Sequence, residues 1–163
     1  MLTFRNVRNR IQGDFEVEAI ERADAEVFAR NIMEDGRGTY TSVILARKGS
    51  GLTKEKLMAC DKTLDFGLGD AQSTSGTLAP IAFLFKPAGK TPQDCFKTVR
   101  SANHQANLLA VANGLVDAAT NNTTGLAFYR TGTPEARAAV GKTTVIWTSP
   151  DLPESAMVYR KDL

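Results

Sequence analysis

The sequence predicts an α/β fold, a three-layer sandwich built on a mostly parallel sheet. From Tyr40 onward, short apolar runs typical of buried strands alternate with stretches of helical spacing, the pattern of strands joined by crossover helices. The 163 residues are 42% hydrophobic and 23% charged, which is the composition of about one ordinary globular domain. A chain of this length buries a sizeable core without disulfides or metals as staples.

The segment before Tyr40 is predicted to hold one amphipathic helix over residues 14–33. Its apolar side chains recur at a spacing near 3.6 residues, and they are Phe15, Ala19, Ile20, Ala23, Val27, Phe28 and Ile32. The turn signal EDGRGTY ends this helix.

Five strands and five helices are predicted after Tyr40. The strand candidates are residues 42–46, 64–67, 97–101, 116–119 and 144–148. The helix candidates are residues 53–59, 78–85, 104–113, 126–129 and 134–139. We expect Thr53 to cap the first helix and Gly114 to end the third in the left-handed conformation. The regular alternation indicates a largely parallel sheet.

Composition excludes several classes of function. The 20 Lys and Arg against 18 Asp and Glu leave a net charge of +2, too balanced for a chain whose main task is to bind nucleic acid. One His and two Cys are too few for a metal site built from several such ligands, and no cofactor is expected. No window approaches the ~20 apolar residues of a membrane span, and the first residues lack the apolar run of a signal peptide. Cys60 and Cys95 are expected to be small buried side chains.

Three polar turns that join a strand candidate to a helix candidate point to a ligand site. They are Ser73–Thr77, Ser101–His104 and Asn121–Thr124. In an open α/β sheet such turns gather at the carboxyl edge of the strands, where ligands bind. A helix start presents unpaired N–H groups and partial positive charge, and Gly76 lets an anion approach the backbone closely. We therefore expect a phosphate-like anion as the ligand.

Each turn also has a purely structural interpretation. Ser and Thr before a helix most often act as caps, and the only histidine, His104, is more often a surface residue. A serine, His104 and Asp117 have the residue types of a hydrolytic triad, yet the chain has no G-x-S-x-G, S-x-x-K or H-E-x-x-H motif. Three hypotheses stay open: oxyanion binding, an enzyme of phosphorus metabolism or hydrolase that uses His104, and a ligand-sensing module.

Five blocks of sequence follow one another in a set order and spacing. They are Ser73–Pro80, Val99–Gly114, Val116–Thr123, Val145–Pro150 and Tyr159–Leu163. This series resembles the phosphate/phosphonate-binding protein of ABC importers. The segment Glu26–Ala29 and the turn into Tyr40 resemble the part of that family just before its second lobe, so the likeness covers roughly residues 14–163.

The resemblance implies the type II periplasmic-binding-protein fold, in which two α/β lobes clamp a ligand in the cleft between them. Residues 40–149 would then be the second, inserted lobe, residues 1–39 a remnant of the first lobe, and residues 150–163 the returning crossover segment. Apolar residues of the flanks would lose their partners in such a chain, which favours a homodimer. The family also implies a periplasmic location and an ABC transporter permease as partner, although the chain itself carries no signal peptide.

The resemblance also implies the ligand-binding residues. They are Ser73, Thr74, Ser75, Gly76, Thr77, His104, Asn122, Thr124 and Glu154. The Ser-Thr-Ser turn would hold the oxyanion with help from the backbone, and His104 would be the family's anion-binding histidine. Acidic groups for the amino end of an aminoalkylphosphonate would fall near Thr124, which has no carboxylate, and near Glu154. The expected ligand is thus a phosphate, phosphite or simple phosphonate, with no catalytic residue.

Overall fold

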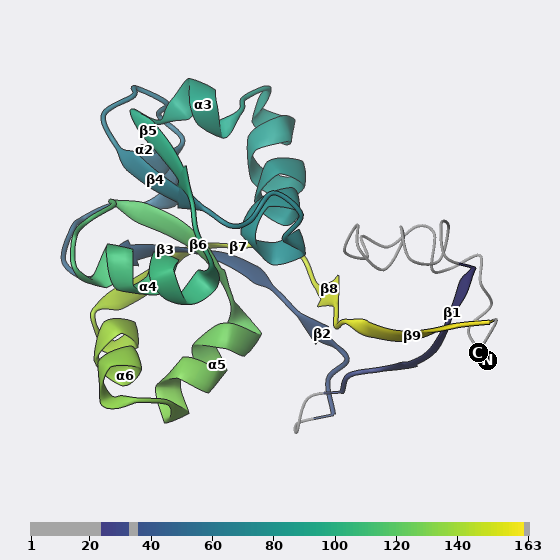
Figure 1. The fold of residues 1–163 in the computed structure, drawn as a ribbon. Helices are drawn as coiled ribbons and strands as arrows, with labels where there is room; N and C mark the ends of the chain where they lie inside the picture. Colours follow the sequence, from purple (N-terminus) through teal and green to yellow (C-terminus); the bar gives the residue numbers. More distant parts are fainter. Residues whose placement is uncertain (1–23, 33–35, 162–163) are drawn as a thin grey trace. The chain divides into compact units, whose positions relative to one another are not determined.

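The computed structural model describes residues 24–32 and 36–161 (Figure 1). Their contacts form two compact units. One unit combines the described residues up to Tyr40 with those from Asp151 onward, and the other is the continuous segment Thr41–Pro150. The boundaries of this second unit differ by one residue from those of the expected inserted lobe, residues 40–149. The assignment of both units to lobes of a larger protein stays a prediction.

The unit Thr41–Pro150 is built on a five-stranded sheet in the order β5-β4-β6-β3-β7 (Figure 1). In chain order the strands are β3 (Ser42–Arg47), β4 (Asp65–Leu68), β5 (Thr98–Ser101), β6 (Ala118–Asn122) and β7 (Thr143–Thr148). β4 pairs in parallel with both β5 and β6, whereas β3 runs antiparallel to β6 and to β7. All strands of this sheet except β3 therefore point the same way, which confirms the mostly parallel sheet.

Helices follow the strands in nearly the predicted places. They are α2 (Lys54–Leu57), the π-helices η2 (Thr74–Leu78) and η3 (Ile81–Phe85), the 3₁₀ helix η4 (Lys86–Ala88), α3 (Pro92–Cys95), α4 (His104–Ala112), α5 (Thr123–Thr131) and α6 (Pro134–Gly141). Thr53 caps α2 by accepting the N–H of Lys56, and Gly114 follows α4 with a φ of +72°, as expected. The second helix begins at Thr74 instead of Leu78, because Ser73 caps it.

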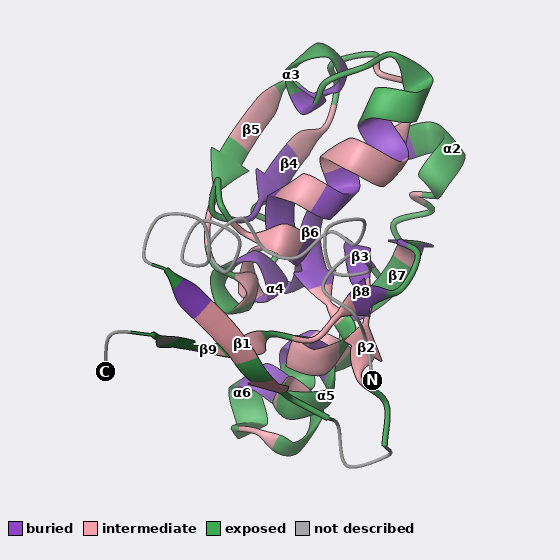
Figure 2. Cartoon of the chain, turned by 90° about the vertical axis from the view of Figure 1, so that its right-hand side faces the viewer, coloured by how far each residue is buried: buried purple, intermediate pink, exposed green. Residues whose placement is uncertain are grey.

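Two hydrophobic cores lie on opposite faces of the sheet. Alternate residues of β3 supply both cores: Ile44 packs on one face with Phe66 and Phe85, and Leu45 packs on the other with Leu108. Figure 2 shows β3, β4 and β6 as the buried centre of this unit. Helices η3 and α3 cover the first face, and α4, α5 and α6 cover the second, which makes the three predicted layers.

The smaller unit contains two short antiparallel ladders. β1 (Ala25–Arg30) pairs with β9 (Ala156–Arg160), and β2 (Thr39–Tyr40) pairs with β8 (Leu152–Pro153). The predicted amphipathic helix over residues 14–33 is therefore wrong for β1, and its first part, residues 14–23, lies outside the described residues. Hydrogen bonding to β9, from the far end of the chain, overrides a local helical spacing.

A disulfide joins Cys60 and Cys95, which are 35 residues apart in sequence. Cys95 is buried as expected, but the two cysteines are bonded to each other instead of being separate small side chains. The bond ties the loop after α2 to the end of α3. The spacing of the cysteines did not predict it, because only the folded chain brings them together.

Candidate functional site: a polar cradle at the start of a helix

The turn Ser73–Thr77 lies where the chain leaves β4 and enters η2. Ser73 has extended backbone angles and its Oγ accepts the N–H of Gly76 at 3.0 Å, so it acts as the helix N-cap. Within the described part of the chain, the N–H groups of Thr74 and Ser75 have no hydrogen-bond acceptor. Free donors of this kind at a helix start attract anions.

Gly76 and Thr77 were expected to help bind the ligand through their backbone. Both N–H groups are already used inside the turn: that of Gly76 by Ser73 Oγ, and that of Thr77 by the backbone oxygen of Ser73 at 3.0 Å. The Thr77 hydroxyl donates to the backbone oxygen of Asp70 at 2.8 Å. The backbone donors without an acceptor are thus two residues earlier than expected, and a direct ligand contact by Gly76 or Thr77 stays a prediction.

Gly76 lets the turn lie directly against the end of β4. The backbone N–H of Gly69 donates to the Gly76 oxygen at 2.9 Å. A Cβ on Gly76 would come within 2.8 Å of the Gly69 Cα and of Ser73 Oγ. The space, and not an unusual φ, therefore requires glycine here, since Gly76 has no positive φ.

The Ser75 side chain is the meeting point of the three predicted turns. Its Oγ lies 3.1 Å from His104 Nε2, at the start of α4, and accepts the Nδ2–H of Asn122, at the end of β6, at 3.1 Å. The Asn122 amide is oriented because its Oδ1 accepts the N–H of Gly125 at 2.6 Å. The structure thus brings Ser75, His104 and Asn122 together at the carboxyl edge of the parallel strands.

The surroundings of His104 favour its neutral form. Burial lowers its pKa from the ordinary value of 6.5, and the backbone of Thr120 offsets part of this shift. Its Nδ1 is buried and has no hydrogen-bond partner among the described residues. An anion at this turn would therefore meet neutral hydrogen-bond donors.

Asp117 does not complete a triad with His104. It directly precedes β6, whereas Asn122 and the Ser75 cluster lie at the other end of that strand. One Asp117 carboxylate oxygen accepts the N–H of Asp65 at 2.8 Å and so connects the starts of β6 and β4. A serine–His104–Asp117 arrangement is not assembled in this fold.

The remaining predicted residues divide between the two units. Thr74 and Thr124 lie in the first turns of η2 and α5 and are half-buried. Glu154 belongs to the other unit, where its backbone N–H donates to the oxygen of Gly38 at 3.1 Å. Contact of Thr124 or Glu154 with a ligand stays a prediction.

Two buried polar residues at this edge, Ser42 and Thr120, were missed by the sequence reasoning, and a third, Asn121, was predicted only as part of a turn. Asn121 Nδ2 donates to the backbone oxygen of His104 at 2.8 Å and so fixes the start of α4. Ser42 and Thr120 donate to backbone oxygens of the Ser73–Thr77 turn. The available signal was the presence of polar residues inside strands that are otherwise buried, since such groups need partners.

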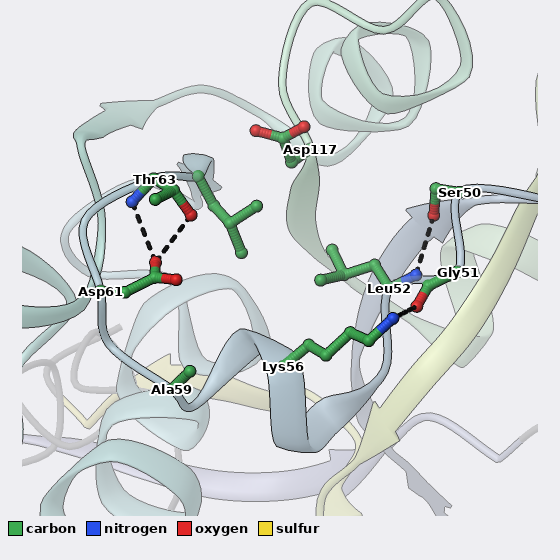
Figure 3. Close-up of a pocket in the computed structure, with 9 residues that line it drawn as sticks. Ser50, Gly51, Leu52, Lys56, Ala59, Asp61, Thr63 and Asp117 are labelled. Carbon is green, nitrogen blue, oxygen red and sulfur yellow. Dashed lines mark hydrogen bonds between the residues drawn. The ribbon is translucent and has the colours of Figure 1, made fainter.

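A cavity of about 340 Å³ lies near the opposite edge of the sheet (Figure 3). Figure 3 shows that its polar groups are engaged locally: Lys56 Nζ donates to the Gly51 oxygen at 2.8 Å, and Asp61 accepts from Thr63. These contacts close the loops around α2, and we assign the cavity no function. The described residues hold no group of three or more side chains suited to bind a metal, and no described helix is long and apolar enough to cross a membrane.

Comparison with known proteins assigns the family. The family model described as the periplasmic substrate-binding protein of phosphonate ABC transporters matches residues 15–163. The chain belongs to this family. Its members are components of transport systems and are periplasmic.

Three relatives match nearly the whole of this chain. The phosphonates-binding periplasmic protein of Escherichia coli (strain K12) is 41% identical over 148 residues, which are 90% of this chain and 43% of that protein. A crystal structure of a binding-protein component of an ABC phosphonate transporter from Pseudomonas aeruginosa is 38% identical, covers 90% of this chain and 48% of that one, and has a TM-score of 0.83. PhnD1 from Prochlorococcus marinus in complex with methylphosphonate is 24% identical, covers 92% of this chain and 54% of that one, and has a TM-score of 0.71.

These relatives confirm the type II periplasmic-binding-protein fold. The chain spans about half the length of the relatives that it matches.

Proposed function

We propose that this chain binds a phosphonate-type oxyanion as the solute-binding component of an ABC importer, or as part of it. The observation that carries the proposal is the cradle of donors at the start of η2. The free N–H groups of Thr74 and Ser75 lie beside the Ser75 hydroxyl, which itself meets His104 and Asn122. Backbone and hydroxyl donors at a helix start suit a tetrahedral oxyanion.

The proposed ligand is a small phosphonate such as methylphosphonate, or phosphite or phosphate. The side chains at the cradle are hydroxyls, an amide and a neutral imidazole, and Thr124 has no carboxylate to pair with an amino group. The name of the Escherichia coli relative and the methylphosphonate complex of the Prochlorococcus marinus relative support a phosphonate. An aminoalkylphosphonate should bind no more tightly than methylphosphonate.

We infer binding without turnover. Asp117 accepts a hydrogen bond from the N–H of Asp65 at the start of β6, whereas Ser75 and His104 meet at the end of that strand. Asp117 therefore supplies no carboxylate to His104. The family consists of transport components, which favours a binding protein over an enzyme. A ligand-sensing module would bind the same anion. Binding to an ABC transporter permease would distinguish the importer component from such a module.

We place the chain in the periplasm, with an ABC transporter permease as partner. The family is periplasmic. The disulfide between Cys60 and Cys95 fits that location, because disulfides persist in oxidising compartments and are rare in the cytosol.

Titration of methylphosphonate into the Ser75→Ala and His104→Ala variants tests the oxyanion site. The loss of one hydrogen bond to a charged group costs about 1.5–3 kcal/mol, which is roughly tenfold or more in affinity. The control is Ser50→Ala, since the Ser50 hydroxyl accepts the N–H of Leu52 beside the other cavity. Unchanged affinity in both site variants would contradict the assignment. Release of methanol from the monomethyl ester of methylphosphonate, or of phosphate from a phosphate monoester, would favour the enzyme hypothesis.

We also propose that the chain forms a homodimer through the β1–β9 ribbon. Phe28, Met157 and Tyr159 are exposed on this ribbon, and the rings of Phe28 and Tyr159 meet at a centroid distance of 6.0 Å. β9 is paired with β1, but each strand still has one edge without a partner among the described residues. Light scattering after size exclusion tests this: the mass of one chain, 17.6 kDa, at every concentration would exclude the dimer.

A further inference from the structure

The two fully buried hydroxyls of Ser42 and Thr120 lie under the Ser73–Thr77 turn, on the adjacent strands β3 and β6. We propose that they are positioning residues for the oxyanion: they touch no ligand themselves but hold the backbone of the turn in its binding geometry. The proposal rests on the oxyanion site inferred above and extends it to residues inside the sheet.

The start of η2 leaves one buried carbonyl without a helical donor. The N–H of Ala79 donates to the oxygen of Thr74, five residues earlier, which is the π-helical pattern. The next donor in that pattern would be residue 80, but Pro80 has no N–H. The oxygen of Ser75, which is buried, must therefore find a partner outside the helix, since an unpaired buried carbonyl is costly.

Ser42 supplies that partner, and Thr120 supplies the next one. Ser42 Oγ donates to the Ser75 oxygen at 2.6 Å, and Thr120 Oγ1 donates to the Gly76 oxygen at 2.7 Å. The N–H of Gly69 donates to the same Gly76 oxygen at 2.9 Å. Two successive carbonyls of the first helical turn are thus directed into the sheet and held by it.

Holding these two oxygens fixes the position of Ser75, whose side chain would meet the anion. A carbonyl oxygen belongs to a rigid peptide plane, so the two bonds fix the planes on both sides of Gly76. The Ser75 side chain is attached to the first of these planes, and its Oγ lies 3.1 Å from both His104 Nε2 and Asn122 Nδ2. Preorganised donors bind an anion without the cost of ordering the turn at the moment of binding.

The experiment compares Thr120→Val and Ser42→Ala with Thr143→Val. Valine has nearly the shape of threonine without the hydroxyl. Thr143 is a matched control, because its buried hydroxyl donates to the Val140 oxygen at 3.1 Å, at the end of α6 and outside the turn. Methylphosphonate is titrated into the full 163-residue chain, with the amide NMR signals of Thr74 and Ser75 as the readout and urea unfolding as the stability measurement.

We expect Thr120→Val and Ser42→Ala each to weaken methylphosphonate binding by roughly fivefold or more, the value of one hydrogen bond. Thr143→Val should lower the free energy of unfolding about as much as Thr120→Val does, and it should leave the affinity for methylphosphonate unchanged. Thr120→Ser, which keeps the hydroxyl, should restore most of the affinity lost in Thr120→Val. This separation of affinity from stability is not expected of a purely structural residue.

Two results would overturn the proposal, and they differ in what they mean for the function. If Ser75→Ala weakens binding while Thr120→Val and Ser42→Ala match Thr143→Val, the positioning role is wrong and the oxyanion site stands. If Ser75→Ala also binds as tightly as the unmodified chain, the oxyanion site itself is wrong, and the positioning role with it.

Discussion

Gly76→Ala should damage the proposed oxyanion site by forcing the Ser73–Thr77 turn away from the end of β4. The new Cβ would lie 2.8 Å from the Gly69 Cα and from Ser73 Oγ, and 3.2 Å from His104 Cε1. Relaxing the backbone contact to about 3.4 Å, an ordinary approach for a Cβ, requires the turn and the end of β4 to separate by roughly half an ångström. Gly69 has no side chain that could move aside, so the turn itself must shift.

The shift has a cost in both stability and affinity. Overpacking a well-packed site typically costs about 1–3 kcal/mol of unfolding free energy. The new Cβ would also crowd His104, so the change should disturb the hydrogen bond between Ser75 Oγ and His104 Nε2, now 3.1 Å. We therefore expect methylphosphonate affinity to fall by about tenfold or more, which is about 1.4 kcal/mol.

The assay is calorimetric or NMR titration of methylphosphonate, together with urea unfolding. The matched control is Gly141→Ala at the end of α6, where a Cβ would have no neighbour within 4 Å. Alanine there should leave affinity unchanged and stabilise the chain by up to about 1 kcal/mol, because glycine is a poor helix former. If Gly76→Ala binds methylphosphonate as tightly as Gly141→Ala, the turn does not form the site.

Three further predictions concern stability. Replacing Cys60 and Cys95 by serine should lower the free energy of unfolding by about 3–4 kcal/mol, which is the chain-entropy value for a bond across 35 residues. Urea unfolding with and without reductant measures this difference. If reductant does not destabilise the unmodified chain, the prediction is wrong. Because burial lowers the pKa of His104 from 6.5 in the folded chain, the unfolded chain binds more protons as the pH falls through about 6.5. The free energy of unfolding should therefore decrease between about pH 7 and pH 5, and His104→Gln should lose that part of the decrease. Asn103 caps α4 by accepting the N–H of Ala106, so Asn103→Ala should cost about 1 kcal/mol in thermal or urea unfolding, whereas Asn103→Ser should cost only a few tenths.

The local pattern of the sequence determined most of the α/β unit. Strand runs, caps and turn residues depend on neighbours a few positions away, so Thr53 and Gly114 were predicted in their observed roles. The turns before η2, α4 and α5 were predicted to meet at one edge, because successive parallel strands point the same way. Ser75, His104 and Asn122 do meet there.

Local sequence patterns did not predict the pairing of segments that lie far apart in the chain. The apolar run of β3 fits a buried strand in either direction, and only its neighbours β6 and β7 decide that it is reversed. The spacing of β1 fits a helix as well as a strand, and its ladder with β9, more than a hundred residues away, decides for the strand. The bond between Cys60 and Cys95 depends in the same way on the folded chain.

The sequence by itself thus determined which residues carry the hydrogen-bond donors of the proposed site: the hydroxyls of the turn, the imidazole of His104 and the amide of Asn122. Only the tertiary structure decided which of these donors stay free and what holds them. It uses the N–H of Gly76 inside the turn and leaves the N–H of Ser75 without an acceptor among the described residues. It also buries the hydroxyls of Ser42 and Thr120 beneath the turn, because buried carbonyls that the helix cannot satisfy must find donors in the sheet.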